Sequence, residues 1–118
     1  MKLFDSELRL MELIWANAGC TAKALSLLAG ESIGWNKNTT YTVLKKLVDK
    51  GAVARIEPGF HCQPLIERDQ VAKEETDGLI SKLFGGSRRA FFASFLQQEK
   101  LSPRELDELR EMIDRYEE

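Results

Sequence analysis

Apolar residues recur at helical spacing through the first third of the chain. Over residues 5–17, positions three and four apart are apolar, and they are Leu8, Met11, Ile14 and Trp15. The spacing predicts a helix with Asp5 as its N-cap and Gly19 just past its end. A shorter helix is expected over residues 22–29, with Thr21 as cap. Its inward side chains are expected to be Leu25 and Leu28.

The third predicted helix, residues 36–50, has two faces of opposite character. Asn36 is a good N-cap, and Gly51 can end the helix. At 100° per residue, one face is the inward one and consists of Thr40, Val43, Leu44 and Leu47. The other face carries hydroxyl, amide, aromatic and amino groups. A helix used only for packing does not need that selection on its first two turns.

Two short runs of strand-forming residues follow this polar helix. "AVARIE" and "FHCQ" flank the turn pair Pro58-Gly59, which predicts a β-hairpin. Three helices followed by a hairpin, with the most polar helix last, are the order of a winged helix-turn-helix. The predicted fold class is therefore mainly α with a small β-hairpin, and the winged helix is expected to occupy residues 1–65.

The second part of the chain is predicted to be helical throughout. One helix is expected over residues 67–84, and a second begins after Ser87. "SPRE" at residues 102–105 is a capping box that opens a third. Amphipathic helices of this length make a small core for one chain, so residues 66–118 are predicted to form a three-helix dimerisation region of a homodimer. The expected interface or core residues are Phe91, Phe95, Leu106, Leu109 and Ile113.

The distribution of charge matters more than its total. The 118 residues carry a formal net charge of −2, which by itself argues against a nucleic-acid partner. Residues 1–64, however, carry eight basic and six acidic residues, a net charge of +2, whereas residues 65–118 have a net charge of −4. Four lysines lie within or beside the polar helix, so the basic half is a candidate for binding DNA.

The polar face of the third helix has the chemistry of a DNA-reading surface. Asn38 can pair bidentately with adenine, threonine methyl groups can contact the thymine methyl group, and lysines can bind guanine or phosphate. Lys50 is also expected to contact phosphate. The residues predicted to bind double-stranded DNA, here called the reading face, are Lys37, Asn38, Thr39, Tyr41, Thr42, Lys45 and Lys46.

The chain resembles the penicillinase-repressor (BlaI/MecI/CopY) family of bacterial transcription regulators. The resemblance lies in "ELRLMELIW", "WNKNTTYTVLKKLVDKGAV" followed by the hairpin, "SKLFGGS" and "LSPRELDELREMID", in that order along nearly the whole chain. It implies a homodimer whose winged helices bind a palindromic operator and whose C-terminal helices interlock. Members of the family repress β-lactamase or related genes, or copper-transport genes.

The resemblance also implies how such a repressor is released. In the β-lactam branch, a system with a membrane sensor-protease leads to cleavage of an Asn-Phe bond in the dimerisation region, and the matching bond here is Ser94-Phe95. The copper-responsive branch carries a C-terminal pair of Cys-x-Cys motifs, and residues 100–118 contain no cysteine. Proteolytic relief at Ser94-Phe95 is the mode of induction that the resemblance favours.

Other classes of protein are less consistent with the sequence. "MKLFDSEL" lacks the apolar stretch of a signal peptide, and no apolar run is long enough to span a bilayer, so a cytoplasmic protein without membrane insertion is expected. Cys20 and Cys62 are expected to be reduced structural thiols. With one histidine and two isolated cysteines, the sequence favours no metal site, no cofactor and no enzymatic activity. The remaining alternative is a winged-helix module that docks proteins without sequence-specific DNA binding.

Overall fold

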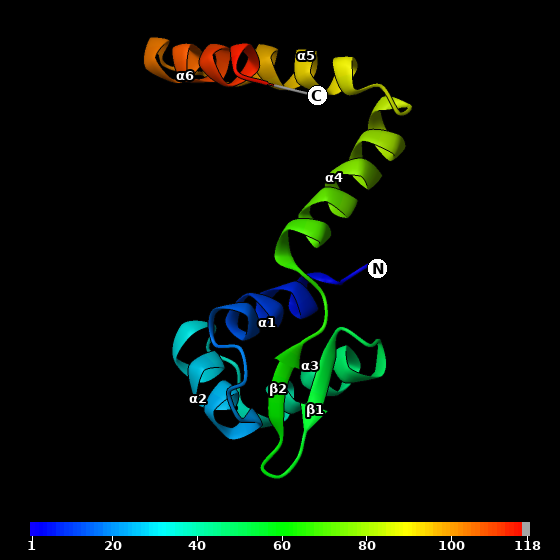
Figure 1. Ribbon diagram of the computed structural model, residues 1–118, viewed down its shortest axis with the longest axis vertical. Helices are drawn as coiled ribbons and strands as arrows, with labels where there is room; N and C mark the ends of the chain where they lie inside the picture. The colour runs from blue at the N-terminus through cyan, green and yellow to red at the C-terminus, as the bar shows by residue number, and fades with distance from the viewer. Residues whose placement is uncertain (117–118) are drawn as a thin grey trace. The chain divides into compact units, whose positions relative to one another are not determined.

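The computed structural model describes residues 1–116, in which six helices and one two-stranded antiparallel sheet form (Figure 1). This confirms the predicted class, mainly α with a small hairpin. None of these helices is both long enough and apolar enough to cross a lipid bilayer. The elements in chain order are α1 Asp5–Ala16, α2 Ala22–Ser32, α3 Lys37–Asp49, β1 Val53–Ile56, β2 His61–Pro64, α4 Arg68–Phe84, α5 Arg88–Gln98 and α6 Pro103–Asp114.

Contacts within the chain divide it into two compact units, residues 1–75 and residues 76–118. The first is here called the winged head, and the described part of the second, residues 76–116, is called the C-terminal unit. The head includes the first two turns of α4. Trp15 Nε1 donates to the Ile66 carbonyl at 2.9 Å, and Arg68 Nε bonds both carboxylate oxygens of Glu12. The predicted boundary at residue 65 is therefore followed by ten further residues that pack with the head.

Helix α1 differs from its prediction in two respects. Its N-cap is Phe4, whose N–H donates to the Glu7 carboxylate at 2.8 Å, and Asp5 is already the first helical residue. The buried face is also rotated from the predicted one, because Leu8 and Trp15 are only half-buried. The residues that this helix buries are Glu7, Leu10, Met11 and Ile14.

Helix α2 supports the helix that follows it. Thr21 caps it as predicted, with its hydroxyl accepting from the Ala24 N–H at 3.1 Å. The helix runs through Gly30 to Ser32 rather than ending at residue 29, and Leu28 is only half-buried whereas Leu25 is fully buried. The turn into α3 needs Gly34, whose φ of 78° lies in the left-handed region that side chains disfavour.

Helix α3 is the centre of the head, and its predicted faces are confirmed. The Asn36 side chain accepts from the Thr39 N–H at 2.8 Å. The buried face is the predicted set of Thr40, Val43, Leu44 and Leu47, while the residues opposite are exposed. α3 packs on α1, α2 and β1. The core residues of the head are Leu3, Leu10, Met11, Ile14, Ala22, Leu25, Ala29, Val43, Leu44, Leu47, Ala52, Val53, Cys62 and Val71.

The predicted hairpin is confirmed as β1 and β2, and the hairpin with its turn, residues 53–64, is here called the wing. The register pairs Val53 with Pro64 and Ile56 with His61. Val53 and Cys62 point into the head core, whereas turn residues 57–59 are exposed and Phe60 is half-buried against the core. An isolated bridge between Thr21 and His61 attaches the wing to the start of α2.

The C-terminal unit contains regular helices but few buried side chains. Ser87 caps α5, and Ser102 and Glu105 form the predicted capping box of α6. One phenylalanine contact, between Phe84 and Phe91, joins α4 to α5, and Phe91 also contacts Phe92 and Phe95 within α5. Ile80 of α4 is buried. Neither α5 nor α6 contains a fully buried residue. The large apolar side chains exposed in this unit are Leu79, Leu83, Phe92, Phe95, Leu96, Met112, Ile113 and Tyr116.

Candidate nucleic-acid interface

The reading face projects from α3 on the side opposite the head core. Six of its seven residues are exposed and Tyr41 is half-buried. The buried threonine Thr40 and three apolar residues on the other side hold the helix against α1, α2 and β1. The helix therefore presents its polar side chains at the surface from a rigid support, which is the arrangement that groove-reading helices use.

The hydroxyl of Thr42 is already engaged within the helix. Its Oγ1 donates to the Asn38 carbonyl at 2.8 Å. With the hydroxyl directed along the helix, the side chain offers its methyl group to a ligand. By contrast, the side chains of Asn38 and Thr39 have no hydrogen-bond partner among residues 1–116. These two residues retain their full hydrogen-bonding capacity for a base edge or a phosphate.

The cations of the reading face differ in their surroundings. The Lys37 ammonium lies 5.8 Å from the centre of the Tyr41 ring, a cation–π arrangement that orients both side chains. Lys45 Nζ lies 3.1 Å from Asp49 Oδ2, one turn further along α3. Lys46 is exposed. Lys37 and Lys46 are thus the lysines of this face without a bound carboxylate among residues 1–116.

Lys50, expected to contact phosphate, instead serves the fold. Its Nζ lies 2.6 Å from Glu7 Oε1 and 3.1 Å from the Lys2 carbonyl, and it lies 4.6 Å from the centre of the Phe4 ring. The expectation was wrong because α1 buries a carboxylate beside the end of α3. If Lys50 moved to a DNA phosphate, the buried Glu7 carboxylate would be left without its cation in apolar surroundings, which is unfavourable.

Glu7 is the buried member of this pair, with 1% of its side chain exposed. Burial raises the pKa of its carboxyl, but bonds from Lys50 and from the Phe4 N–H outweigh burial and leave that pKa below its usual value. Sequence reasoning missed Glu7, although its spacing to Leu10, Met11 and Ile14 is that of one helical face. The pair fixes the C-terminal end of α3 to α1.

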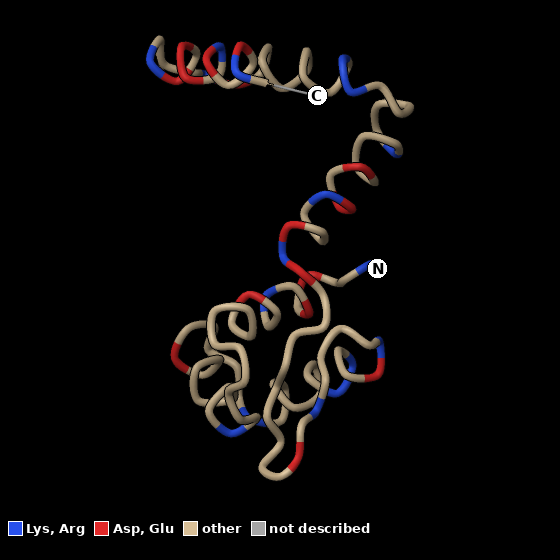
Figure 2. Tube along the Cα trace, viewed as in Figure 1, with Lys and Arg blue, Asp and Glu red and all other residues tan. Residues whose placement is uncertain are grey.

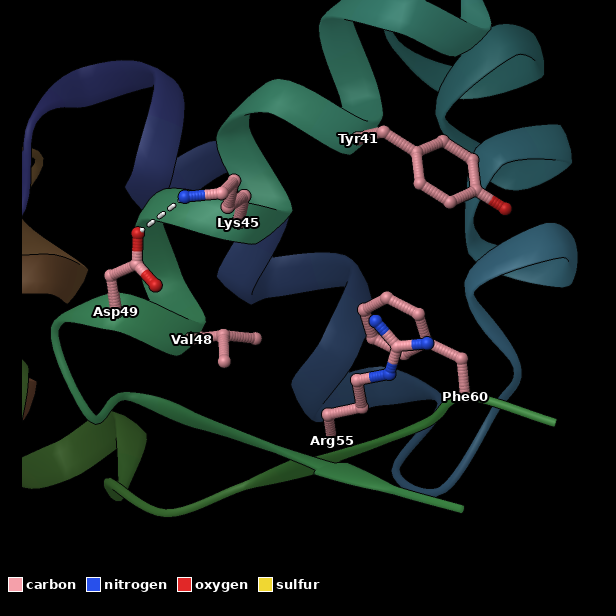
Figure 3. A pocket seen from close by; sticks show the side chains of 6 residues that line it. All are labelled: Tyr41, Lys45, Val48, Asp49, Arg55 and Phe60. Atoms are coloured by element: carbon pink, nitrogen blue, oxygen red, sulfur yellow. Dashed lines mark hydrogen bonds and ion pairs between the residues drawn. The ribbon is translucent and has the colours of Figure 1, made fainter. Parts of the chain in front are cut away.

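A groove between α3 and the wing is the second feature that sequence reasoning missed. It has a volume of about 390 Å³, and its lining residues come from both elements (Figure 3). The wing supplies Arg55, which bonds Glu57 and stacks 4.0 Å from the centre of the Phe60 ring. Tyr41 and Phe60, 19 positions apart in the sequence, are in contact here, and no local sequence pattern predicts such a contact.

The two cysteines lie beside each other on the far side of the wing. The Cys62 N–H donates to the Cys20 carbonyl at 2.7 Å, and both thiols are free. Burial, and secondarily Cys20, raise the pKa of Cys62 to about 11, so this thiol stays protonated at neutral pH. His61 is exposed on β2, and its Nδ1 donates to the Gly19 carbonyl at 2.8 Å. Among residues 1–116, no group of three or more His, Cys, Asp or Glu side chains could hold a metal ion.

The residues predicted to form an interface lie in the C-terminal unit with different exposures. Phe91, Leu106 and Leu109 are half-buried, and Phe95 is exposed. Ile113 is 73% exposed, so it belongs to no core within this chain. Acidic and basic residues alternate along α6 (Figure 2), and pairs such as Arg110 with Asp107, 3.0 Å apart, occupy its solvent-facing side. Ser94 lies inside α5, where its hydroxyl accepts from Gln98 Nε2 at 3.0 Å.

These features define the class of protein. Three helices, a two-stranded wing and an exposed polar helix held by an apolar face make a winged helix-turn-helix, and helices α4 to α6 follow it. The sequence matches the model of the penicillinase repressor family over residues 3–115. The chain belongs to the penicillinase repressor family.

Individual relatives agree with this assignment. The chain is 22% identical to the penicillinase repressor of Bacillus licheniformis over 117 residues, which cover 98% of this chain and 91% of that protein. It is also 22% identical to the methicillin resistance regulatory protein MecI of Staphylococcus aureus (strain N315) over 116 residues, covering 97% and 94%. A penicillinase repressor from Staphylococcus aureus is 22% identical over 110 residues, covering 92% and 87%.

Proposed function

We propose that this protein is a transcriptional repressor that binds a palindromic DNA operator as a homodimer, with α3 of each copy in a major groove. The observation that carries the proposal is the exposed polar face of α3, which stands opposite a fully buried face in the same helix. Family membership supports it. Asn38 is the adenine reader, the Thr42 methyl group contacts a thymine, and Lys37, Thr39, Tyr41, Lys45 and Lys46 contact bases or phosphates.

The partner chain is a second copy of this protein, joined through the C-terminal unit. The exposed apolar residues of α5 and α6 support this, because one copy leaves them in water. In the dimer, Phe91, Phe95, Leu106, Leu109 and Ile113 are buried between the two copies. Two joined heads then bind the two half-sites of an operator with the combined strength of both.

Release occurs by cleavage of the Ser94-Phe95 bond in response to a membrane sensor-protease system. The cut removes residues 95–118, including all of α6, and leaves the head core intact. Because this bond lies within α5, the helix must first open locally to give a protease an extended segment. Each head remains folded, but binding of one head no longer holds the second head close to its half-site, so the affinity falls. Mass spectrometry of the protein from induced cells tests this step, and an intact chain that has left its operator contradicts it.

Selection of duplexes from a random pool, followed by binding measurements, tests operator recognition. We expect a palindromic consensus. Thr42→Ser keeps the hydroxyl but removes the methyl group, whereas Thr42→Val keeps the methyl group and replaces the hydroxyl with a second methyl group. Thr42→Ser should therefore lose roughly 1–2 kcal/mol of preference for one thymine over uracil, and Thr42→Val should retain it. Asn38→Ala should relax the preference for adenine.

The other candidate function is a protein-docking winged helix, which the net charge of −2 favours slightly. The same selection separates the two. A pool that yields no enriched sequence, together with equal binding by wild type and a Thr42→Ala/Lys45→Ala variant, would favour docking and reject the repressor.

A further inference from the structure

The groove between α3 and the wing combines an apolar floor with two cations from different elements. Val48, Tyr41 and Phe60 form the floor, and the two rings meet edge to face with 6.5 Å between their centres. Lys45 reaches the groove from α3 and Arg55 reaches it from β1 (Figure 3). Tyr41 and Lys45 also belong to the reading face, so the groove continues that face toward the wing.

Each of the two cations holds a carboxylate of its own. Lys45 is bound to Asp49 and Arg55 to Glu57, which also accepts from the Phe60 N–H at 3.3 Å. All four side chains are more than half exposed to solvent. Exposed ion pairs of this kind are weak, so another anion can displace the carboxylates at small cost. In the free protein, therefore, the two cations line the groove, and each has its charge balanced by its own carboxylate.

We propose that this groove seats one phosphate and the adjoining sugar of the DNA backbone, and that Asp49 and Glu57 act as built-in attenuators of DNA binding. The proposal rests on the repressor function above and adds to it a binding site on the wing. A phosphodiester fits because its anionic oxygens match Lys45 and Arg55, while a deoxyribose can cover the apolar floor. Duplex DNA is the occupant because the groove adjoins the face that reads the bases.

Binding then exchanges one anion for another at each cation. Lys45 and Arg55 turn from their carboxylates to the phosphate, and the two carboxylates remain close to it. Each carboxylate competes with the phosphate for its own cation, so Asp49 and Glu57 lower the affinity. A phosphate carries no sequence information, and the reduction therefore applies to operator and non-operator DNA alike. In this way the protein limits its retention by the bulk of the chromosome without altering which bases it reads.

The full-length protein and two DNA probes test the proposal. One probe is the duplex selected from a random pool by the wild-type chain, and the other is a shuffled duplex of the same length and composition. Asp49→Asn and Glu57→Gln are compared with Glu99→Gln, which makes the same change in charge at the end of α5, outside the head. Fluorescence anisotropy gives the Kd of each at several salt concentrations.

Asp49→Asn and Glu57→Gln should each tighten binding to both probes by roughly threefold to tenfold and steepen the salt dependence, whereas Glu99→Gln should bind as wild type does. Arg55→Ala should weaken binding to both probes. In that background, Glu57→Gln should give no gain, because the carboxylate acts by holding Arg55. Thermal unfolding checks that every variant is folded.

The outcomes separate the two proposals. Suppose that wild type selects an operator but that Asp49→Asn and Glu57→Gln bind both probes no more tightly than Glu99→Gln does. The attenuating role of Asp49 and Glu57 is then rejected, and the proposed repressor function is unaffected. A Glu57→Gln gain that persists without Arg55 also rejects the phosphate seat, since general charge then explains it. If wild type selects no operator, the proposed function itself fails.

Discussion

The winged head and the C-terminal unit are both mainly helical but bury very different amounts of apolar surface. In the head, fourteen residues form one continuous core that draws on every element from α1 to the start of α4. In the C-terminal unit, Ile80 is the only fully buried apolar residue among residues 76–116, and eight large apolar side chains are exposed. The head has what a chain needs to fold alone, whereas the C-terminal unit leaves most of its large apolar side chains exposed, as the proposed dimer requires.

The same contrast appears in the helices themselves. α3 has a polar face that water covers and an apolar face that the head covers. α6 has an equally clear division, but its apolar side includes Met112 and Ile113, both largely exposed. Amphipathic helices with no internal partner are typical of subunit interfaces. In the proposed repressor, this difference separates the head that contacts DNA from the unit that joins two heads.

Truncation after Glu75 should produce the largest effect. The head keeps its core, including Val71, so it should fold as a monomer. Affinity for a palindromic operator should fall roughly 100-fold or more, because the two half-sites are no longer bound by joined heads. Light scattering measures the mass of the truncated chain, and fluorescence anisotropy measures its affinity for the operator. A dimer of the truncated chain, or an unchanged operator affinity, contradicts the division of roles.

Leu44→Ala should destabilise the head by about 3 kcal/mol. Leu44 is 1% exposed at the centre of the core, and its truncation loses apolar contact and leaves a cavity. Leu27→Ala is the matched control, since Leu27 lies on α2 with 64% of its surface exposed. Urea unfolding of the truncated head gives both values. Equal losses for the two variants would show that the core is not where the head's stability lies.

Lys50→Met should cost roughly 2–3 kcal/mol at pH 7, because it leaves the buried Glu7 carboxylate without its cation. Lys23→Met, at an exposed site on α2 of the same head, should cost almost nothing. The pKa of Glu7 is lower in the folded protein than in the unfolded one. Its contribution is thus fully present above the unfolded pKa, near 4.5, and is lost as the pH falls through the folded pKa.

Urea unfolding of the truncated head across this range of pH measures the Glu7 contribution. Wild type should lose stability on acidification more steeply than Glu7→Gln, which has no carboxylate to protonate at this site. Parallel curves for the two proteins would mean that other carboxylates determine the acid sensitivity of the head.

Ile113→Glu should weaken dimerisation by roughly tenfold or more and leave the thermal unfolding of the head unchanged. Ile113 is largely exposed in one copy, so a glutamate there costs little until a partner covers it. Arg104→Gln makes the same change in net charge on the opposite side of α6 and is the control. Sedimentation equilibrium measures the dissociation constant. An unchanged constant removes Ile113 from the interface.

Much of this fold could be predicted because its signals are local. The Asn36 cap, the Ser102–Glu105 capping box and the turn at Pro58-Gly59 each depend on residues a few positions apart. The buried face of α3 also follows from helical spacing within one element. For α1 the apolar residues cover more than half of the helix, so spacing alone left its orientation open, and the predicted face was rotated from the buried one.

By itself, then, the sequence determined the order of the elements, most of their N-caps and the two faces of α3, and it predicted the reading face that makes a DNA-binding winged helix the expected class. Only the tertiary structure decided that Glu7 is buried, that Lys50 is bound to it across 43 positions and that the first turns of α4 pack with the head. It also brought Lys45 and Arg55 to one groove with their carboxylates. Helical spacing and caps depend on interactions within one or two turns, whereas these pairings depend on how separate elements pack, which no local pattern specifies.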